Sequence, residues 1–398
     1  MSCREETRYH SHPLPNRRSR DGQVPNRLNY VLWIKGIIDS TTHRDGGGDQ
    51  IIRGIDIGTG ASAIYPLLGC AVNPNWHFVA TDIDDISLLY ASTNIKANNL
   101  ESRIKTRKSD ADGPILSPLT SPSRDGADLD QQPFDFTMCN PPFYASKEEI
   151  ALLAGAKEFD PHAVCTGSTL EMITEGGEVG FVKRMIEESR TVPLRCRWFT
   201  SLLGKLSSVV EVVEMLKNIG VDNYGITEFV QGHTRRWGVA WSFGDERLPD
   251  NLARISNHAL QAAIPPHNNL QQTYGNTISP EGLMDTIRSV LSAHPGMHVE
   301  EIPALGQNPS VLASLRVCAW GNTWSRAARR KKRNDDEMQV DTRDGAHGST
   351  PASVECVIEG RRKELGACYL ECRWVRGRDR ALFESLWSHL SRKVAGAR

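Results

Sequence analysis

Strand-like and helix-like segments alternate between residues 51 and 139, and this alternation limits the chain to a small set of folds. Helical spacing is visible over Ala61–Leu68 and Asp84–Asn98. Runs rich in β-branched and aromatic residues predict strands at Ile51–Ile57, Trp76–Thr81, Ile104–Lys108 and Phe134–Cys139. Strands that alternate with helices in this way predict an α/β fold with a parallel, doubly wound sheet.

The 398 residues are enough for this domain and a smaller one. We expect the first domain over residues 26–245, where strand pairs near Tyr224–Val230 and Trp237–Phe243 form an antiparallel edge. The polar segment 246–275 predicts a linker, and residues 276–398 predict an α+β unit of order α-β-β-β-β-α. Its middle, 325–352, predicts a basic disordered loop. The Arg-, Ser- and Pro-rich residues 1–25 predict a disordered lead or a truncated module.

Composition excludes several classes of protein. No stretch approaches about 18 uninterrupted apolar residues, so we expect no membrane span. The polar start Met-Ser-Cys-Arg-Glu-Glu has no signal-peptide core. The nine cysteines include no Cys-x-x-Cys pair and indicate a reducing compartment, without a disulfide framework or a metal site. We expect a monomer in the nucleus, the cytoplasm or both, where the basic run Arg329–Arg333 can act as a localisation signal or an RNA-backbone contact.

The tetrapeptide Asn140-Pro141-Pro142-Phe143 follows the last predicted strand directly. Pro141 ends the strand, so the Asn140 amide lies at a carboxyl end, where open α/β sheets bind ligands. The Asn140 oxygen and the Pro141 carbonyl can each accept one hydrogen of a planar amino group. The ring of Phe143 can stack on the base that carries this group. The motif therefore predicts a site for an exocyclic amine.

A glycine-rich turn with Gly58 and Gly60 follows the first predicted strand, and Asp82 ends the second. This pattern is typical of both nicotinamide and S-adenosylmethionine sites, since each needs an acid for ribose hydroxyls. Asp56 comes just before the glycines, where it can face a cationic amino acid moiety but is unfavourable beside pyrophosphate. Asp56 and the Asn140 motif together favour S-adenosylmethionine as the cofactor.

Six segments also follow the order and spacing of one known family: Arg27-Leu-Asn-Tyr30, Gly54-Ile-Asp-Ile-Gly-Thr-Gly-Ala-Ser62, Cys139-Asn-Pro-Pro-Phe143, Thr174–Arg184, Leu203-Gly-Lys205 and Thr227–Trp237. They resemble the methyltransferase-like 16 family of RNA adenine-N6 methyltransferases. Its eukaryotic members modify U6 small nuclear RNA, and a bacterial branch modifies 23S ribosomal RNA. The resemblance covers roughly residues 25–245 and implies a Rossmann-like class I methyltransferase fold.

The resemblance implies roles for particular residues. Arg27, Gly58, Ser62 and Asp82 are implied to contact the cofactor, with Asp110 in the loop after the third strand as a further contact. Asn140 to Phe143 are implied to hold a flipped adenine, and we expect Tyr144 to provide a second stacking ring. Family members carry a longer basic module before the position of Arg27. The C-terminal unit looks like the kinase-associated-1-like domain that binds RNA in vertebrate members.

Basic residues near this core are the candidates for RNA contact. Arg235 and Arg236 lie between two predicted aromatic strands and are implied to approach RNA, where we expect them to contact phosphate. Lys183, Arg184 and Lys205 flank the core and can equally be solvated surface residues. The expected partner is a structured RNA with an unpaired target adenosine.

Other functions remain open from the sequence. Protein-glutamine N5 methyltransferases also bind a planar amide with an Asn-Pro-Pro-aromatic motif, although they typically have Tyr where this chain has Phe143. A DNA adenine methyltransferase, a non-catalytic RNA-binding factor and a nicotinamide oxidoreductase are the further alternatives. Cofactor binding and the identity of the modified group distinguish them.

Overall fold

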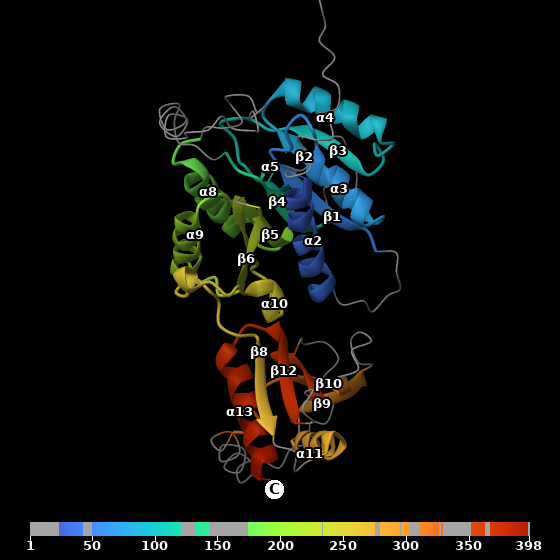
Figure 1. Cartoon of the computed structure of the whole chain (residues 1–398), viewed down its shortest axis with the longest axis vertical. Helices are drawn as coiled ribbons and strands as arrows, with labels where there is room; N and C mark the ends of the chain where they lie inside the picture. The colour runs from blue at the N-terminus through green and yellow to red at the C-terminus, as the bar shows by residue number, and fades with distance from the viewer. Residues whose placement is uncertain are drawn as a thin grey trace, which may run out of the picture.

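A computed structural model shows two units, each built on one β-sheet (Figure 1). The described residues are 24–42, 50–120, 132–142, 174–232, 234–274, 279–294, 296–302, 311–325, 328, 352–362 and 367–396. Phe143, Tyr144, the basic run 329–333, the lead over 1–23 and most of the predicted loop over 325–352 lie outside the described residues.

The first unit contains a seven-stranded sheet in the order β3-β2-β1-β4-β5-β7-β6. The first five strands run parallel, whereas β7 is antiparallel to both β5 and β6. The predicted parallel sheet and its antiparallel edge pair are confirmed, and the order is the Rossmann-like one that the resemblance implied. The strands are β1 (Ile52–Ile57), β2 (Trp76–Asp82), β3 (Ile104–Lys108), β4 (Phe134–Cys139), β5 (Cys196–Leu203), β6 (Tyr224–Gln231) and β7 (Thr234–Trp241).

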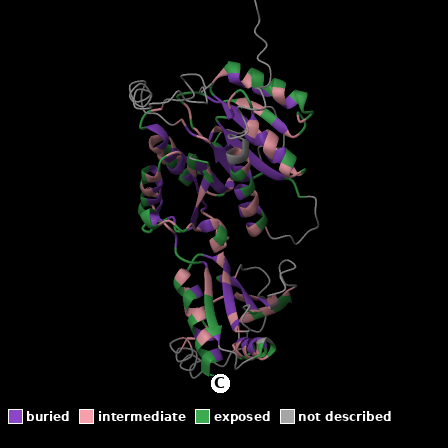
Figure 2. Cartoon of the chain, in the orientation of Figure 1, coloured by how far each residue is buried: buried purple, intermediate pink, exposed green. Residues whose placement is uncertain are grey.

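Helices cover both faces of this sheet, and two apolar clusters fill the space beneath them. Strands β1 and β4 are buried at every position, as the centre of the upper unit in Figure 2 shows. Strands buried on both faces have nearly continuous apolar sequences, which is why the sequence located them. One face carries α2 (Val24–Thr41), α3 (Ile64–Val72) and α4 (Asp85–Ala97), the other carries α8 (Gly177–Thr191) and α9 (Leu206–Asn218), and the short α5 (Ser117–Thr120) precedes β4.

The second unit is a five-stranded antiparallel sheet in the order β8-β12-β11-β10-β9. Two helices, α11 (Pro280–Ser292) and α13 (Arg380–Gly396), pack on it and on each other around an apolar core. Its centre holds Trp374 stacked on Phe383, with ring centroids 5.2 Å apart. From α11 to α13 the elements follow the predicted α-β-β-β-β-α order. The strands are β8 (Asn269–Tyr274), β9 (Met297–Ile302), β10 (Val311–Ala319), β11 (Val354–Arg362) and β12 (Cys368–Gly377).

The segment 246–275 is not the linker that its composition suggested. It forms α10 (Asp250–Ala253), which packs on α2 and β6, and the 3-10 helix η2 (His258–Leu260), which packs on α9. It then forms β8, which pairs with β12 from Tyr274↔Cys368 to Asn269↔Arg373. The polar sequence Asn-Leu-Gln-Gln-Thr-Tyr lacks an apolar strand pattern, so hydrogen bonding to β12 is what fixes this strand.

Arg247 joins the two units. Its backbone N–H donates to the Val375 carbonyl at 2.8 Å, and its buried guanidinium donates to the Gly377 carbonyl at 2.8 Å. The guanidinium also lies 4.1 Å from the centroid of the Trp374 ring and pairs with Asp222 at 3.1 Å. Because a buried cation needs all of these partners, they fix how the second unit sits against the first.

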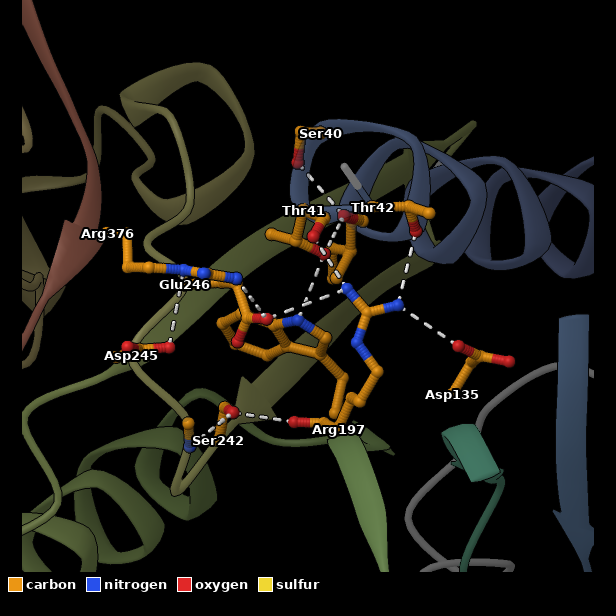
Figure 3. Close-up of polar contacts among 12 residues, drawn as sticks. Ser40, Thr41, Thr42, Asp135, Arg197, Ser242, Asp245, Glu246 and Arg376 are labelled. Atoms are coloured by element: carbon orange, nitrogen blue, oxygen red, sulfur yellow. Dashed lines mark hydrogen bonds and ion pairs between the residues drawn. The ribbon is translucent and has the colours of Figure 1, made fainter. Parts of the chain in front are cut away.

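A second polar cluster connects the units at the amino edge of the first sheet, where β4 and β5 begin (Figure 3). Arg197 donates to Asp135 at 3.0 Å and to the Thr41 carbonyl at the end of α2 at 2.6 Å. Glu246 lies 4.0 Å from Arg197 and 3.2 Å from Arg376 of β12. The second unit therefore meets the edge opposite the one where β1, β2 and β4 end.

Candidate active site at the carboxyl edge of the first sheet

The glycine turn after β1 has a backbone that only residues without a bulky side chain adopt easily. Gly58 and Gly60 have φ angles of 69° and 60°. A Cβ added to Gly58 meets no atom of the described residues within 4 Å, so this part of the structure leaves open space beside Gly58. The Gly60 N–H donates to Asp82 Oδ2 at 2.8 Å, and the Thr59 N–H donates to the Thr81 carbonyl at 2.9 Å. The turn is therefore held against the end of β2 and leaves room for a ligand.

Asp56 is the most unusual group at this edge. It is fully buried, and neither carboxylate oxygen has a hydrogen-bond partner among the described residues. Burial raises its pKa to about 7, to which the charge of Asp82 adds, while the nearby Thr59 hydroxyl opposes the rise without completing a hydrogen bond. A buried carboxylate with no hydrogen-bond partner among the described residues suits a cationic ligand group. The ammonium of S-adenosylmethionine is such a group.

Asp82 is the last residue of β2 and is 5% exposed. Its carboxylate oxygens accept from the Gly60 and Asp84 N–H groups, at 2.8 and 3.0 Å, and each oxygen has a further lone pair for a ribose hydroxyl. The Ser109 N–H donates to the Asp82 carbonyl at 2.8 Å, which brings the exposed Asp110 to the same place. Two of the acids predicted to contact the cofactor, Asp82 and Asp110, therefore lie at neighbouring strand ends.

Arg27 and Ser62 complete the predicted cofactor set. Ser62 is exposed on the turn, one residue before Ala63, the N-cap of α3. Arg27 lies on α2, which packs on α3, the helix that carries Tyr65. Burial raises the pKa of Tyr65 well above its usual range, with the charge of Arg27 opposing this rise and that of Asp56 adding to it. The charges of Arg27 and Asp56 therefore both act on the Tyr65 hydroxyl, in opposite directions.

Asn140 lies beside the glycine turn because of the register between β4 and β1. Ile57 pairs with Cys139, so the next residues, Gly58 and Asn140, leave neighbouring strands together. Asn140 is half-buried, Pro141 is buried and Pro142 is half-buried. The structure thus brings the predicted amide site and the predicted cofactor turn to one point on the edge of the sheet.

The basic residues predicted to contact RNA have protein partners. Lys183 pairs with Glu211 at 3.4 Å, and Arg184 donates to the Gly113 carbonyl at 3.5 Å. Lys205 occupies the N-cap position of α9, two residues after the end of β5.

On β7, Arg235 pairs with Glu228 at 2.9 Å, and Arg236 donates to the Arg235 carbonyl at 2.9 Å. The Arg235 side chain is 60% exposed, so this pair is weak and its cation can also meet phosphate. Because β7 is antiparallel, both arginines lie at its amino end and therefore on the same edge as Asn140.

Two supporting groups were not singled out from the sequence. The buried Glu178 on α8 accepts from the Gly204 and Lys205 N–H groups at 2.6 and 3.0 Å, and so joins two separate sequence motifs. The buried Tyr30 hydroxyl accepts from the Cys139 N–H at 3.2 Å, one residue before Asn140. Both lie within motifs of the resemblance, but their roles depend on contacts across the fold.

No group of three or more His, Cys, Asp or Glu side chains within the described ranges could hold a metal ion. In the same part of the chain, no helix is long and apolar enough to cross a membrane.

Comparison with known proteins places the chain in a family. The RNA methyltransferase family matches residues 15–245. The U6 small nuclear RNA (adenine-(43)-N(6))-methyltransferase of Schizosaccharomyces pombe is 36% identical over 371 residues, which are 93% of this chain and 86% of that protein. The RNA N(6)-adenosine-methyltransferase METTL16 of Mus musculus is 41% identical over 225 residues, 56% of this chain and 39% of that protein.

A solved structure of the hMettl16 catalytic domain in complex with a MAT2A 3′UTR hairpin is 40% identical, with a TM-score of 0.47, and the match covers 56% of this chain and 70% of that one. The chain thus spans most of the fission yeast protein and about two fifths of the mouse protein. The resemblance drawn from the motifs is confirmed by the family match, and the residues at the carboxyl edge fit S-adenosylmethionine as the cofactor. The chain belongs to the RNA methyltransferase family.

Proposed function

We propose that this protein transfers a methyl group from S-adenosylmethionine to the N6 amine of an unpaired or flipped adenosine in structured RNA, with a U6 small nuclear RNA as substrate. The register between β1 and β4 carries this proposal. Because Ile57 lies opposite Cys139, the cofactor turn and Asn140 leave the sheet side by side. A donor on the turn and an amine at Asn140 are then oriented for direct transfer.

The substrate assignment is supported by the relatives. The fission yeast protein, of which this chain covers 86%, is named for methylation of an adenine N6 in U6 small nuclear RNA. The side-chain amide of glutamine is the other planar NH2 group that the Asn140 motif can hold, and the family match favours RNA over it. We also infer that the protein acts in the nucleus, where its substrate is made, and a fluorescent fusion tests this.

Asn140 and Pro141 provide the chemistry that the acceptor needs. The N6 lone pair of adenine is delocalised into the ring, so the nucleophile is weak. Hydrogen bonds from both amino hydrogens to the Asn140 oxygen and the Pro141 carbonyl orient this lone pair toward the methyl carbon. A nitrogen–carbon bond forms as the carbon–sulfur bond breaks, and one amino proton leaves to water. Asp56 holds the ammonium of the donor, and Asp82 holds its ribose.

A paired adenosine cannot reach this geometry, so the target is unpaired or extruded from a helix. Lys205, Arg235 and Arg236 lie on the same edge and contact the phosphates around it. The second unit, with its kinase-associated-1-like order of elements, contacts the same RNA.

The test is a methylation assay with the full chain, a U6-like hairpin and a labelled methyl donor, followed by mass spectrometry of the nucleosides. We expect N6-methyladenosine. Asn140→Ala removes the amide acceptor and lowers turnover at least about 100-fold. Its affinity for S-adenosylhomocysteine, measured by calorimetry, stays close to that of the wild type.

The matched control is Asn98→Ala, which removes an exposed amide at the end of α4 that donates to the Asn94 carbonyl of the same helix. This variant retains full turnover. Label in another nucleoside, label in protein glutamine, or full turnover by Asn140→Ala contradicts the proposal.

A further inference from the structure

The sheet loses its regular pairing just before Asn140. Registered pairs between β4 and β5 occur at Phe134↔Cys196 and Phe136↔Trp198, whereas β1 follows β4 as far as Cys139. On the β5 side, the last residues of β4 therefore need other hydrogen-bond partners. This gap lies directly beneath the residue that we assign to the acceptor amine.

Three buried hydroxyls fill the gap. The Tyr30 hydroxyl, from α2, lies 2.7 Å from Thr200 Oγ1 and accepts from the Cys139 N–H at 3.2 Å. Thr200 Oγ1 donates to the Thr137 carbonyl at 2.7 Å, and the Thr200 N–H donates to Thr137 Oγ1 at 3.2 Å. Tyr30, Thr137 and Thr200 each have 0% exposure, so water does not substitute for these bonds.

The donor and the acceptor of each hydrogen bond between Tyr30, Thr200 and Thr137 can be assigned. Thr200 uses its proton on the Thr137 carbonyl, so the proton between Tyr30 and Thr200 comes from Tyr30. Burial raises the pKa of Tyr30 well above its usual range, which keeps the phenol protonated and able to donate. The Tyr30 and Thr200 hydroxyls thus each have one acceptor, and the Cys139 N–H donates to the first of them.

Aromatic rings hold Tyr30 in this position. Its ring stacks on Trp33 with centroids 6.4 Å apart and meets Tyr65 and Phe229 edge-on at 5.7 and 6.2 Å. The same helix carries Arg27 one turn earlier, so a rigid α2 links the cofactor side of the site to the acceptor side.

We propose that Tyr30 is a positioning residue for methyl transfer, acting with Thr200 to hold the Cys139–Asn140 peptide so that the Asn140 oxygen stays aimed at the acceptor amine. This inference rests on the proposed function of the same site. A misplacement of about 1 Å at a reacting group can lower the rate about 100-fold, so loss of the hydroxyl acts on turnover rather than on binding.

The test compares Tyr30→Phe and Thr200→Val, which remove hydroxyls, with Thr200→Ser, which keeps one. Tyr224→Phe is the matched control, because its hydroxyl is also buried and donates to the Ala263 carbonyl at 3.1 Å, in the apolar cluster on the other face of the sheet from Tyr30. For each variant we measure kcat and KM with hairpin RNA, calorimetric affinity for S-adenosylhomocysteine, thermal stability, and hydrogen exchange of the peptide that contains Cys139.

We expect Tyr30→Phe and Thr200→Val to lower kcat about 10- to 100-fold while KM and cofactor affinity change less than about threefold. Exchange of the Cys139 peptide rises in both variants. Thr200→Ser restores most of kcat. Tyr224→Phe lowers the melting temperature but leaves kcat and the exchange of this peptide unchanged.

Unchanged kcat in Tyr30→Phe overturns the inference, as does an equal loss of kcat in Tyr224→Phe, which points to a general stability effect. If the wild type forms no N6-methyladenosine, the proposed function fails instead. The exchange measurement then still decides the hydrogen-bond part of the inference, since unchanged exchange in Tyr30→Phe refutes it.

Discussion

Replacing Asp56 with Asn separates what this residue does for stability from what it does for the cofactor. The pKa of Asp56 rises from 3.8 to about 7 because it is fully buried. A difference of about 3 between the folded and unfolded pKa values corresponds to about 4 kcal/mol. The pKa of Asp56 is higher in the folded than in the unfolded protein. The free energy of unfolding of the ligand-free protein therefore falls by this amount as pH rises from about 4 to about 7. At pH 8 the ionised Asp56 therefore destabilises the fold by an amount of this order.

We expect ligand-free Asp56→Asn to be more stable than the wild type at pH 8, by up to about 4 kcal/mol, with the difference shrinking toward pH 4. Chemical denaturation across this range measures the effect. The control is Asp112→Asn, at an exposed site on the loop after β3, which we expect to show no such difference.

Asp56→Asn should also bind the cofactor less well than the wild type. Loss of a charge-assisted contact to the ammonium corresponds to about 10- to 100-fold weaker binding of S-adenosylhomocysteine. In the wild type, only about a tenth of the protein molecules have an ionised Asp56 at pH 6. The affinity for S-adenosylhomocysteine at pH 6 is therefore about tenfold below the value it reaches at high pH. A wild-type affinity that does not change between pH 6 and pH 8, or an Asp56→Asn protein that is less stable at pH 8, refutes this reasoning.

Three further predictions concern other parts of the molecule. Gly58→Ala places a side chain at a φ of 69°, which costs about 1–2 kcal/mol, and directs its Cβ into the ligand space, so calorimetry should show weaker cofactor binding in a folded protein. Arg247→Met removes the contact with Trp374 and the buried hydrogen bonds between the two units, which together contribute about 2–4 kcal/mol. Urea unfolding should therefore change from one transition to two. A single transition at an unchanged urea concentration counts against this. Glu228→Gln releases Arg235, so RNA affinity should rise and its salt dependence should steepen by about one counterion, while an unchanged slope means that Arg235 does not contact phosphate.

Parts of the site could be predicted from the sequence because single residues impose them. Pro141 must end β4, which places Asn140 at the end of a strand. Gly58 and Gly60 mark a sharp turn, and Asp82 marks the end of β2. These signals depend only on neighbouring residues, so they can be recognised in the sequence without knowledge of the fold.

Other parts could not be predicted because they depend on contacts between distant segments. The register that places Gly58 beside Asn140 is set by packing of β1 on β4. Tyr30 and Thr200 are 170 residues apart in the chain, and nothing in either neighbourhood indicates that their hydroxyls meet. Strand β8 was missed because its sequence is polar and only pairing with β12 makes it a strand. Phe143, Tyr144 and their predicted stacking on the base stay predictions.

The attachment of the second unit sets a minimum length for any RNA that reaches both units. Arg197, Glu246 and Arg376 fasten that unit where β4 and β5 begin, whereas Asn140 lies where β4 ends. A strand of six residues spans about 20 Å, so the two ends of the domain are at least that far apart. A short oligonucleotide around the target adenosine can occupy the methylation site alone. A longer folded RNA that runs along the side of the catalytic domain can contact both the methylation site and the second unit. The protein can then select its RNA substrate by length.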